Sequence, residues 1–396
     1  MDNEIEWKEK RVGLGNAIIV SAVFLVIGIV IGLNWTSLFG SFGPFLGFNA
    51  SSNVNWSSLD EVYQKLNSNY YGEISADKVV EGAKKGLTEA LGDVYTVYMN
   101  PEEAAEFNDD LHGNVGAGIG VEMGLRDGYV RVLRTLPDNP AKKAGILAGD
   151  ILYKVNDEEV YELSTEEISN KVRGEEGTDV KITVVRDGKE KEFKLKRETI
   201  NNVSAYVEYD GKTAIVTLTR FDEDTGKKVE EFANKFKDKG INKVILDLRG
   251  NGGGFVSSAQ DLLSLWLDGE DIYLQRSKHF DDVKTASKSG KAILKDMKTI
   301  VLVNGTTASA SEIVAGALQD YGKATILGET TYGKGVVQTL FTLSDGSRLK
   351  VTTATWYTPK ERSINEKGIE PDVKVERSFE DINAMRDPQM DKAKKL

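Results

Sequence analysis

The chain has 396 residues, 51 basic and 62 acidic side chains, and a formal net charge of −11. This acidic balance argues against a nucleic-acid-binding protein, which usually presents a basic face. The chain has no cysteine, which excludes disulfides, thiol catalysis and thiolate zinc sites. It has only two histidines and no HExxH-like spacing, so a zinc hydrolase is not expected and no metal or cofactor is predicted.

An uncharged apolar run predicts a transmembrane helix at residues 12–34. The run is about the 20 residues that a helix needs to cross a bilayer. Lys8, Lys10 and Arg11 precede it, so the positive-inside rule places residues 1–11 in the cytoplasm and the remainder outside. The alternative is a cleaved signal peptide, but its apolar core would be shorter and no small-x-small cleavage site follows. We therefore expect a single-pass protein of the cell membrane.

The next two segments are a linker and a helical region. Residues 35–57 are rich in Gly, Ser, Asn and aromatic residues and are predicted to form a linker near the outer membrane surface. Residues 58–105 carry apolar side chains at helical spacing, for example Leu59, Val62 and Leu66. No chemistry is evident there, so these helices are predicted to serve packing or self-association into a homo-oligomer.

Residues 106–198 change to short strands and short helices that resemble a PDZ domain. The resemblance is carried by "GIGV" at 118–121, "PAKKAGILAGDIL" at 140–152 and "GEEGTDVKITVVRDG" at 174–188. In such domains the backbone amides of the first motif bind the carboxylate of a peptide C-terminus, and the peptide adds a strand to the sheet. The alternative for these glycines is turn geometry alone.

The resemblance implies a binding site for peptide C-termini at Gly118, Ile119, Gly120 and Val121. Apolar C-terminal residues are the expected ligands. Ile119 and Val121, together with Leu133, are expected to line a pocket beside the carboxylate site.

Residues 199–375 alternate strand and helix patterns, and residues 376–396 form a C-terminal tail. "TAIVTLTRF", "KVILDLRG", "KTIVLVNG" and "ATILGE" are predicted strands, and "VVQTLFTL" and "RLKVTTATWYTP" are expected to complete the set. Helical patterns fall between several of them. This order predicts an α/β core with an open, mainly parallel sheet covered by helices.

Two serines, Ser309 and Ser311, lie where a predicted strand turns into a helix. Such a corner presents a hydroxyl at the carboxyl end of a sheet, beside helix N-terminal amides. Ser309 and Glu312 also fit a capping box, so Ser309 as a plain helix cap is a structural alternative. A catalytic serine needs a base, and both histidines are far away in sequence.

Lys334 offers a base. "GETTYGKG" at 328–335 nearly matches a phosphate-binding loop, but Gly335 stands where a hydroxyl must hold magnesium, and a β-branched strand follows in place of a helix. A lysine becomes a base when burial lowers its pKa. Lys334 and Gln338 are expected on one face of a strand, where Gln338 orients the neutral amine. The pattern indicates a Ser–Lys dyad.

A second glycine-rich corner follows the strand "VILDL". In "GNGGG" at 250–254, glycines allow close approach of a backbone, and their amides can point at an oxyanion. The motif resembles the "GNSGG" of trypsin-like proteases, but Gly252 replaces the serine. A trypsin-like protease is therefore not expected.

Four motifs in this order behind a PDZ domain resemble the carboxyl-terminal processing peptidases of serine peptidase family S41. They are "LDLRGNGGG", "TTASASEIVAGALQDYG", "GETTYGKGVVQ" and "TWYTPKERSINEKGIEPDV". The resemblance implies a crotonase/Clp-peptidase-like core. It assigns Ser309 as nucleophile, Lys334 as base, Gln338 as its support, and the amides of Gly253 and Ala310 as the oxyanion hole.

One position departs from the family pattern: Val94 stands where the family usually has proline. The expected protein is a membrane-anchored serine endopeptidase that acts outside the cytoplasm on protein substrates bound by their C-termini. The alternative is a catalytically inactive PDZ scaffold on a peptidase fold.

Overall fold

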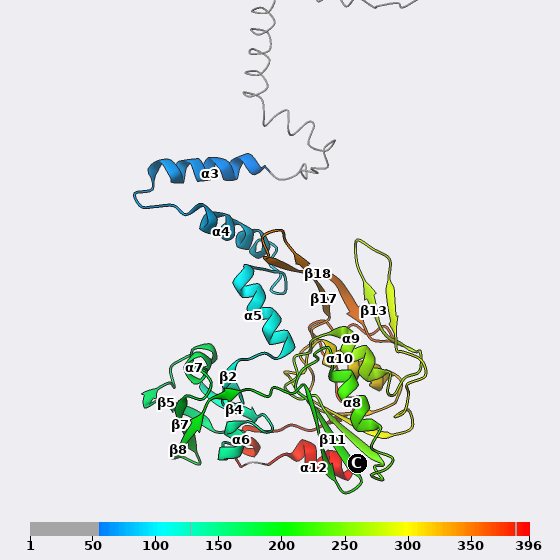
Figure 1. Ribbon diagram of the computed structural model, residues 1–396. Coiled ribbons are helices and arrows are strands. Elements are labelled where there is room, and N and C mark those ends of the chain that lie inside the picture. Colours follow the sequence, from blue (N-terminus) through cyan, green and yellow to red (C-terminus); the bar gives the residue numbers. More distant parts are fainter. Residues whose placement is uncertain (1–54, 127, 385) are drawn as a thin grey trace, which may run out of the picture. The chain divides into compact units, whose positions relative to one another are not determined.

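The computed structural model describes residues 55–126, 128–384 and 386–396 (Figure 1). The predicted transmembrane helix at 12–34 lies outside these residues. In the part of the chain that is described, no helix is long and apolar enough to span a membrane. The chain divides into two compact units, Met1–Val79 and Val80–Leu396.

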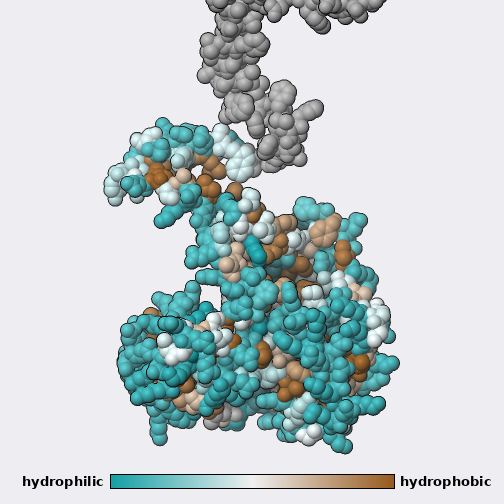
Figure 2. Space-filling model, viewed as in Figure 1, coloured by the Kyte–Doolittle hydropathy of each residue, from teal (hydrophilic) through white to brown (hydrophobic). Residues whose placement is uncertain are grey.

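The predicted helical region is present as α3 (Trp56–Asn69) and α4 (Ala76–Glu89). No residue of α3 is buried, and Leu59, Val62 and Leu66 are each between 45% and 57% exposed. Apolar side chains therefore lie at the surface of this helix among polar ones (Figure 2). Self-association through these helices stays a prediction.

The PDZ-like segment folds into an antiparallel sheet of six strands in the order β3-β4-β5-β7-β8, with β6 beside β5. A small separate pair joins β2 (Ala117–Gly118) to β9 (Glu198–Thr199). The sheet contains β3 (Val121–Arg126), β4 (Tyr129–Thr135), β5 (Ile151–Val155), β6 (Glu158–Glu159), β7 (Asp179–Arg186) and β8 (Lys189–Lys196), and the helices are α6 (Pro140–Ala144) and α7 (Thr165–Val172).

Local sequence explains these elements. The predicted capping box begins α7, because Ser164 accepts from the backbone N–H of Glu167 and the Glu167 carboxylate accepts from Ser164 N–H. Alternate residues of the strands, such as Val130 and Val132, are buried in one apolar core. This period-two burial is typical of an antiparallel sheet with one face covered.

The core of the second half is a six-stranded sheet in the order β10-β11-β12-β15-β16-β19. All neighbours from β11 onward run parallel, and β10 is antiparallel to β11, so the predicted mainly parallel sheet is confirmed. Its strands are β10 (Ala205–Asp210), β11 (Thr213–Leu218), β12 (Lys243–Asp247), β15 (Lys298–Val303), β16 (Thr325–Gly328) and β19 (Val373–Lys374).

Helices cover both faces of this sheet. Val244 and Leu246 of β12 join the core with α8 (Thr225–Ala233), α9 (Val256–Leu263) and α10 (Ala310–Asp320). Ile245, between them, joins a second cluster with Ala393 of α12 (Pro388–Lys395). Successive strand side chains point to opposite faces, so apolar runs such as "KVILD" are buried on both sides.

One expectation about the sheet was wrong. β17 (Val336–Thr342) and β18 (Arg348–Tyr357) are strands but do not complete the parallel sheet. They belong to a separate five-stranded sheet in which β18 pairs antiparallel with β1, β13 and β17, and β14 pairs with β13. The short turn between β17 and β18 favours a hairpin, which can only be antiparallel.

The remaining members of this second sheet come from distant parts of the chain. They are β1 (Val97–Met99), β13 (Asp271–Arg276) and β14 (Val283–Ala286). The other helices are α5 (Pro101–His112) and α11 (Phe379–Asn383). Because β1 pairs with β18, residues just before β1 are brought beside the segment that carries Lys334 and Gln338.

Candidate active site

Ser309 stands at the N-cap of α10, directly after the turn that follows β15. Its backbone has φ 57° and ψ −118°, a conformation that L-residues rarely adopt. Strain of this kind costs about 1–3 kcal/mol and clusters at active sites. The Glu312 half of the predicted capping box is present, because this carboxylate accepts from the Ser309 N–H, whereas no side-chain cap hydrogen bond of normal geometry joins the Ser309 hydroxyl to the helix. Ser309 is therefore the N-cap residue of the predicted capping box with Glu312, and its backbone is strained there.

Ser311 has a different environment. It is fully buried, and its Oγ donates to the backbone oxygen of Asn251 at 3.0 Å. A hydroxyl that is buried and already donating is suited to packing the two corners together. Of the two serines, Ser309 is the one whose hydroxyl the helix does not use.

Glu312 joins the serine corner to the lysine. Its carboxylate is fully buried and accepts four hydrogen bonds. Oε2 accepts from the backbone N–H groups of Ser309 (2.8 Å) and Lys334 (3.0 Å), and Oε1 accepts from Gly333 N–H (2.7 Å) and Thr331 Oγ1 (2.5 Å). The sequence identified Glu312 only as a capping residue. The capping pattern was the available signal, but it could not show the bonds to residues 331–334.

Lys334 lies in the turn before β17, not within the strand as the sequence predicts. Its backbone is fixed at both ends: the N–H donates to Glu312, and the carbonyl oxygen accepts from Trp356 Nε1 at 2.9 Å. Burial lowers the pKa of Lys334, the positive charge of Lys350 lowers it further, and Glu312 opposes both. A lowered pKa is what a lysine needs to act as a base.

An aromatic ring covers the amine of Lys334. Its Nζ lies 5.2 Å from the ring centroid of Tyr95, in the segment just before β1. Burial and a hydrogen bond with Tyr332 raise the pKa of Tyr95 to about 12. The sequence gave no sign of this contact, because Tyr95 and Lys334 are far apart in the chain.

Gln338 is half-buried on β17, and its Nε2 has no hydrogen-bond partner among the described residues. Thr352 lies opposite it on β18. The strand register shifts between Val337 and Gln338, so simple alternation cannot place Gln338 on the face of Lys334. Gln338 nevertheless offers a buried amide donor close to the lysine turn in sequence.

Gly253 and Ala310 lie against the serine corner. A Cβ built on Gly253 would be 2.8 Å from Ser309 Cβ and 3.0 Å from Ala310 N, so only glycine fits. Its φ of 102° also favours glycine. However, the Gly253 N–H donates to Oδ1 of Asn251 at 2.9 Å. The predicted oxyanion donor therefore has a partner inside the protein, and Asn251 is a second residue that sequence reasoning missed.

The four residues predicted to bind a peptide C-terminus line one cavity. Gly118, Ile119, Gly120 and Val121 surround about 110 Å³. The expectation for Leu133 was wrong: Leu136 lines this cavity in its place, and Leu133 borders a different one. Leu133 follows Val132 on β4, and Val132 is buried in the core, so strand alternation turns Leu133 to the other face.

A strained serine at a helix N-cap, a half-buried lysine whose backbone is bound by the same carboxylate, and a PDZ-like module ahead of them in the chain together indicate a PDZ-containing serine peptidase. Family models agree: residues 212–375 match "Peptidase family S41", residues 117–196 match "PDZ domain", and residues 48–103 match "Activating protease CtpB N-terminal domain".

Relatives extend the match over most of the chain. A probable CtpA-like serine protease of Staphylococcus epidermidis is 37% identical over 344 residues, which is 86% of this chain and 70% of the relative. One from Staphylococcus saprophyticus is 35% identical over 367 residues, 92% of this chain and 72% of the relative. The chain therefore belongs to the CtpA-like serine proteases of peptidase family S41.

Solved structures show the same fold. The photosystem II D1 C-terminal processing protease aligns with a TM-score of 0.57 and 27% identity, over 84% of this chain and 90% of that one. An S41 protease of Bacteroides fragilis aligns with a TM-score of 0.54 at 16% identity, over 79% and 85%.

Proposed function

We propose that this S41 peptidase is a membrane-anchored endopeptidase that cleaves extracytoplasmic proteins through a Ser309–Lys334 dyad. The dyad is supported mainly by the Glu312 carboxylate, which accepts hydrogen bonds from the backbone N–H groups of Ser309 and Lys334 at 2.8 and 3.0 Å. One buried anion thus fixes the nucleophile and the base relative to each other. The lowered pKa of Lys334 supports its role as the base.

In this mechanism neutral Lys334 accepts the Ser309 proton as the hydroxyl oxygen attacks the peptide carbonyl. The tetrahedral intermediate collapses to an acyl-enzyme when Lys334 returns the proton to the leaving amine. Water, deprotonated by the same lysine, then hydrolyses the ester. Gln338 orients the amine, and the amides of Gly253 and Ala310 stabilise the oxyanion.

The PDZ domain supplies the substrate preference. In this proposal the backbone around Gly118, Ile119 and Gly120 binds the terminal carboxylate of the substrate. The adjoining cavity accepts the apolar side chains of the substrate. Amidation of a substrate's C-terminus should then weaken cleavage of an otherwise identical protein.

The anchor is inferred from the uncharged run at residues 12–34 and from the basic residues before it. Fusion of a reporter enzyme that is active on one side of the membrane only, placed after residue 57, tests this orientation. A cleaved signal peptide would instead give a product that lacks the run.

The dyad is tested with a fluorophosphonate probe and a protein substrate. We expect the wild type and Ser311→Ala to label and to cleave, and Ser309→Ala to do neither while keeping its melting temperature. An inactive PDZ scaffold should not label in any form. Cleavage by Ser309→Ala overturns the assignment of the nucleophile.

A further inference from the structure

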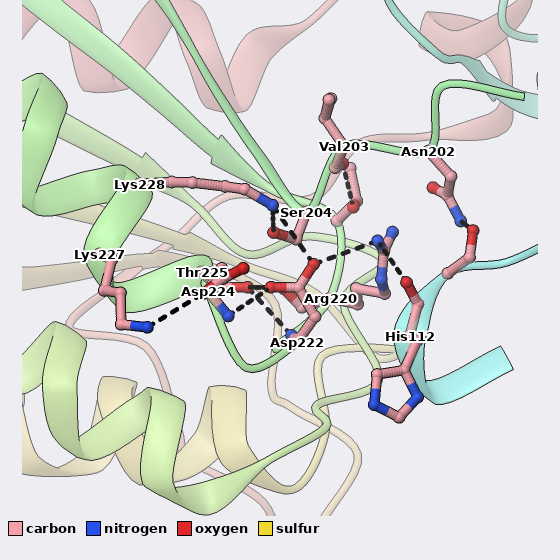
Figure 3. A network of polar contacts seen from close by, with 12 residues as sticks. His112, Asn202, Val203, Ser204, Arg220, Asp222, Asp224, Thr225, Lys227 and Lys228 are labelled. Carbon is pink, nitrogen blue, oxygen red and sulfur yellow. Dashed lines mark hydrogen bonds and ion pairs between the residues drawn. The ribbon is translucent and has the colours of Figure 1, made fainter. Parts of the chain in front are cut away.

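The segment Thr219–Asp222, which joins β11 to α8, contacts both linkers to the PDZ domain. One linker is His112–Gly113, where the chain leaves α5, and the other is Asn202–Ser204, where the chain returns to the core (Figure 3). The same short segment also binds the glycine-rich loop 252–255, hereafter the oxyanion loop. The two linkers and the oxyanion loop therefore all contact the same four residues.

Arg220 makes the contact with the outgoing linker. Its Nη2 donates to the backbone oxygen of His112 at 3.4 Å and to Asp222 Oδ2 at 3.2 Å (Figure 3). A Cβ added to Gly113 would lie 2.1 Å from the same nitrogen. The guanidinium therefore packs directly against the linker backbone, and Gly113 leaves it the room.

The returning linker is bound beside it. Thr219 N–H donates to the oxygen of Ser204 and its Oγ1 donates to the oxygen of Val203, both at 2.9 Å. Asn202 Nδ2 reaches the oxygen of Gly113 at 3.4 Å and so joins the two linkers (Figure 3). A displacement of either linker would thus change the hydrogen bonds that hold Thr219–Asp222.

Phe221, between Arg220 and Asp222, binds the oxyanion loop. Its N–H donates to the oxygen of Gly253 at 2.8 Å, and its own oxygen accepts from Phe255 N–H at 2.8 Å. The contact is close, because a Cβ on Gly254 would lie 2.2 Å from the Phe221 oxygen. The His112 ring also meets the Phe255 ring edge-on, with centroids 5.8 Å apart.

The surroundings of Arg220 remove part of its guanidinium group from water. Its Nε and Nη1 are buried and have no hydrogen-bond partner among the described residues. Burial lowers the pKa of Arg220, and Asp222 and Glu122 oppose this. Two of the three guanidinium nitrogens therefore lose water without gaining a protein partner, which offsets part of the stability that the ion pair with Asp222 contributes.

We propose that Arg220 is a positioning residue for the oxyanion loop: it clamps Thr219–Asp222 against the PDZ linkers, and Phe221 carries that constraint to Gly253. The proposal rests on the proposed roles of Ser309 and Gly253. In the arrangement described, the Gly253 N–H is bound to Asn251, so the loop must turn before this amide can stabilise an oxyanion. Arg220 determines how the loop is held while the linkers move.

The test compares full-length wild type with Arg220→Met, which keeps a long apolar stem and removes the guanidinium. We measure kcat and KM on a peptide substrate, the melting temperature, and the inhibition constant of a peptide boronic acid, whose adduct with Ser309 places an oxygen in the oxyanion hole. We expect kcat to fall about 10- to 100-fold, the scale for a displaced catalytic group. Boronate affinity should fall by a similar factor, and KM should stay within about twofold.

Lys227→Met is the matched control, since it removes an exposed cation of the same network that contacts neither linker. It should behave as wild type, and Arg220→Lys should recover part of kcat.

Wild-type kcat in Arg220→Met, or a loss of kcat without a loss of boronate affinity, overturns the proposal. If Arg220→Met does not fold, Asp222→Asn decides in the same assay: a selective loss of kcat supports the clamp, and wild-type kcat contradicts it. An active Ser309→Ala protein would instead show that the proposed function itself is wrong.

Discussion

The serine corner and the oxyanion loop are adjacent, yet they are held in different ways. At the serine corner, one fully buried carboxylate, Glu312, accepts four hydrogen bonds and fixes the backbones of Ser309 and Lys334. Hydrogen bonds to charged groups are stronger than those between neutral groups. The backbones of the proposed nucleophile and base are therefore held by the fold itself.

The oxyanion loop depends on neutral contacts. Gly253 donates to the side chain of Asn251 and accepts from Phe221, and no charged side chain binds its backbone in the described structure. Its amide consequently faces the protein. In the proposed site, the backbones of the two proton-transfer residues are therefore fixed by a charged group, whereas the amide proposed to stabilise the oxyanion is bound within the protein. Variants in each half should therefore fail in different ways.

The largest effect is expected from Gly253→Ala. The new Cβ would clash with Ser309 Cβ, fill the space before Ala310 N, and sit at a φ of 102°. We expect kcat to fall about 10²- to 10³-fold, the scale for losing one oxyanion donor. Gly252→Ala is the control, because its Cβ meets nothing within 4 Å. Equal activity of the two variants in a steady-state assay would argue that the loop plays no part in catalysis.

Glu312→Gln should damage the other half. The amide oxygen can still accept two of the four hydrogen bonds. The NH₂ group replaces the other carboxylate oxygen and cannot accept from the two donors that bind there. We expect a loss of about 1.5–3 kcal/mol in stability and a fall of about 10²-fold in kcat. Thermal unfolding and turnover measure both, with exposed Glu231→Gln as the control. A Glu312→Gln variant that unfolds normally and turns over normally would show that the four bonds do not position the dyad.

Local patterns predicted much of the fold and indicated the residues of the proposed dyad. The apolar runs of β12, β15 and β16 could only be buried strands, and the order of strands and helices gave a parallel sheet. Ser309 was identifiable because strand, corner and helix are contiguous. Similarly, the capping box of α7 is contained in four consecutive residues. Each of these features depends on residues that are close together in the sequence.

What could not be predicted depends on pairing between distant segments. β18 pairs with β1, so that Lys350 lies opposite Val97, and no local pattern selects that partner. This pairing brings Tyr95 over Lys334 and places Lys350 within electrostatic reach of it. The surroundings that lower the pKa of Lys334 could therefore not be predicted from the sequence, although Lys334 itself was a candidate base.

Lys350→Met tests that tuning. The positive charge of Lys350 lowers the pKa of Lys334, so its removal should raise that pKa. Because neutral Lys334 is the reactive form in the proposed mechanism, the rise of kcat/KM with pH should move to higher pH. A shift of one pH unit corresponds to about tenfold less activity on the acidic limb. Lys350→Arg keeps the charge and should leave the profile in place. A displaced profile in Lys350→Arg would point to packing on Phe107 instead. An unchanged profile in Lys350→Met would show that the charge of Lys350 does not set the pKa of Lys334.

Tyr95→Leu should give a smaller shift in the opposite direction. An aromatic face stabilises the ammonium form by about 0.5–1 kcal/mol, which is less than one pKa unit. Leucine keeps the amine covered but removes the ring, so the pKa of Lys334 should fall and the acidic limb of kcat/KM should move to lower pH. Tyr95→Phe retains the ring and loses only the hydroxyl that bonds Tyr332, so its profile should match the wild type. Opposite shifts in Lys350→Met and Tyr95→Leu, measured in one buffer series, would establish that the segment before β1 and strand β18 act on the base from two sides. A shift to higher pH in Tyr95→Leu would mean that the ring lowers the pKa of Lys334 through burial more than it raises it through its π face.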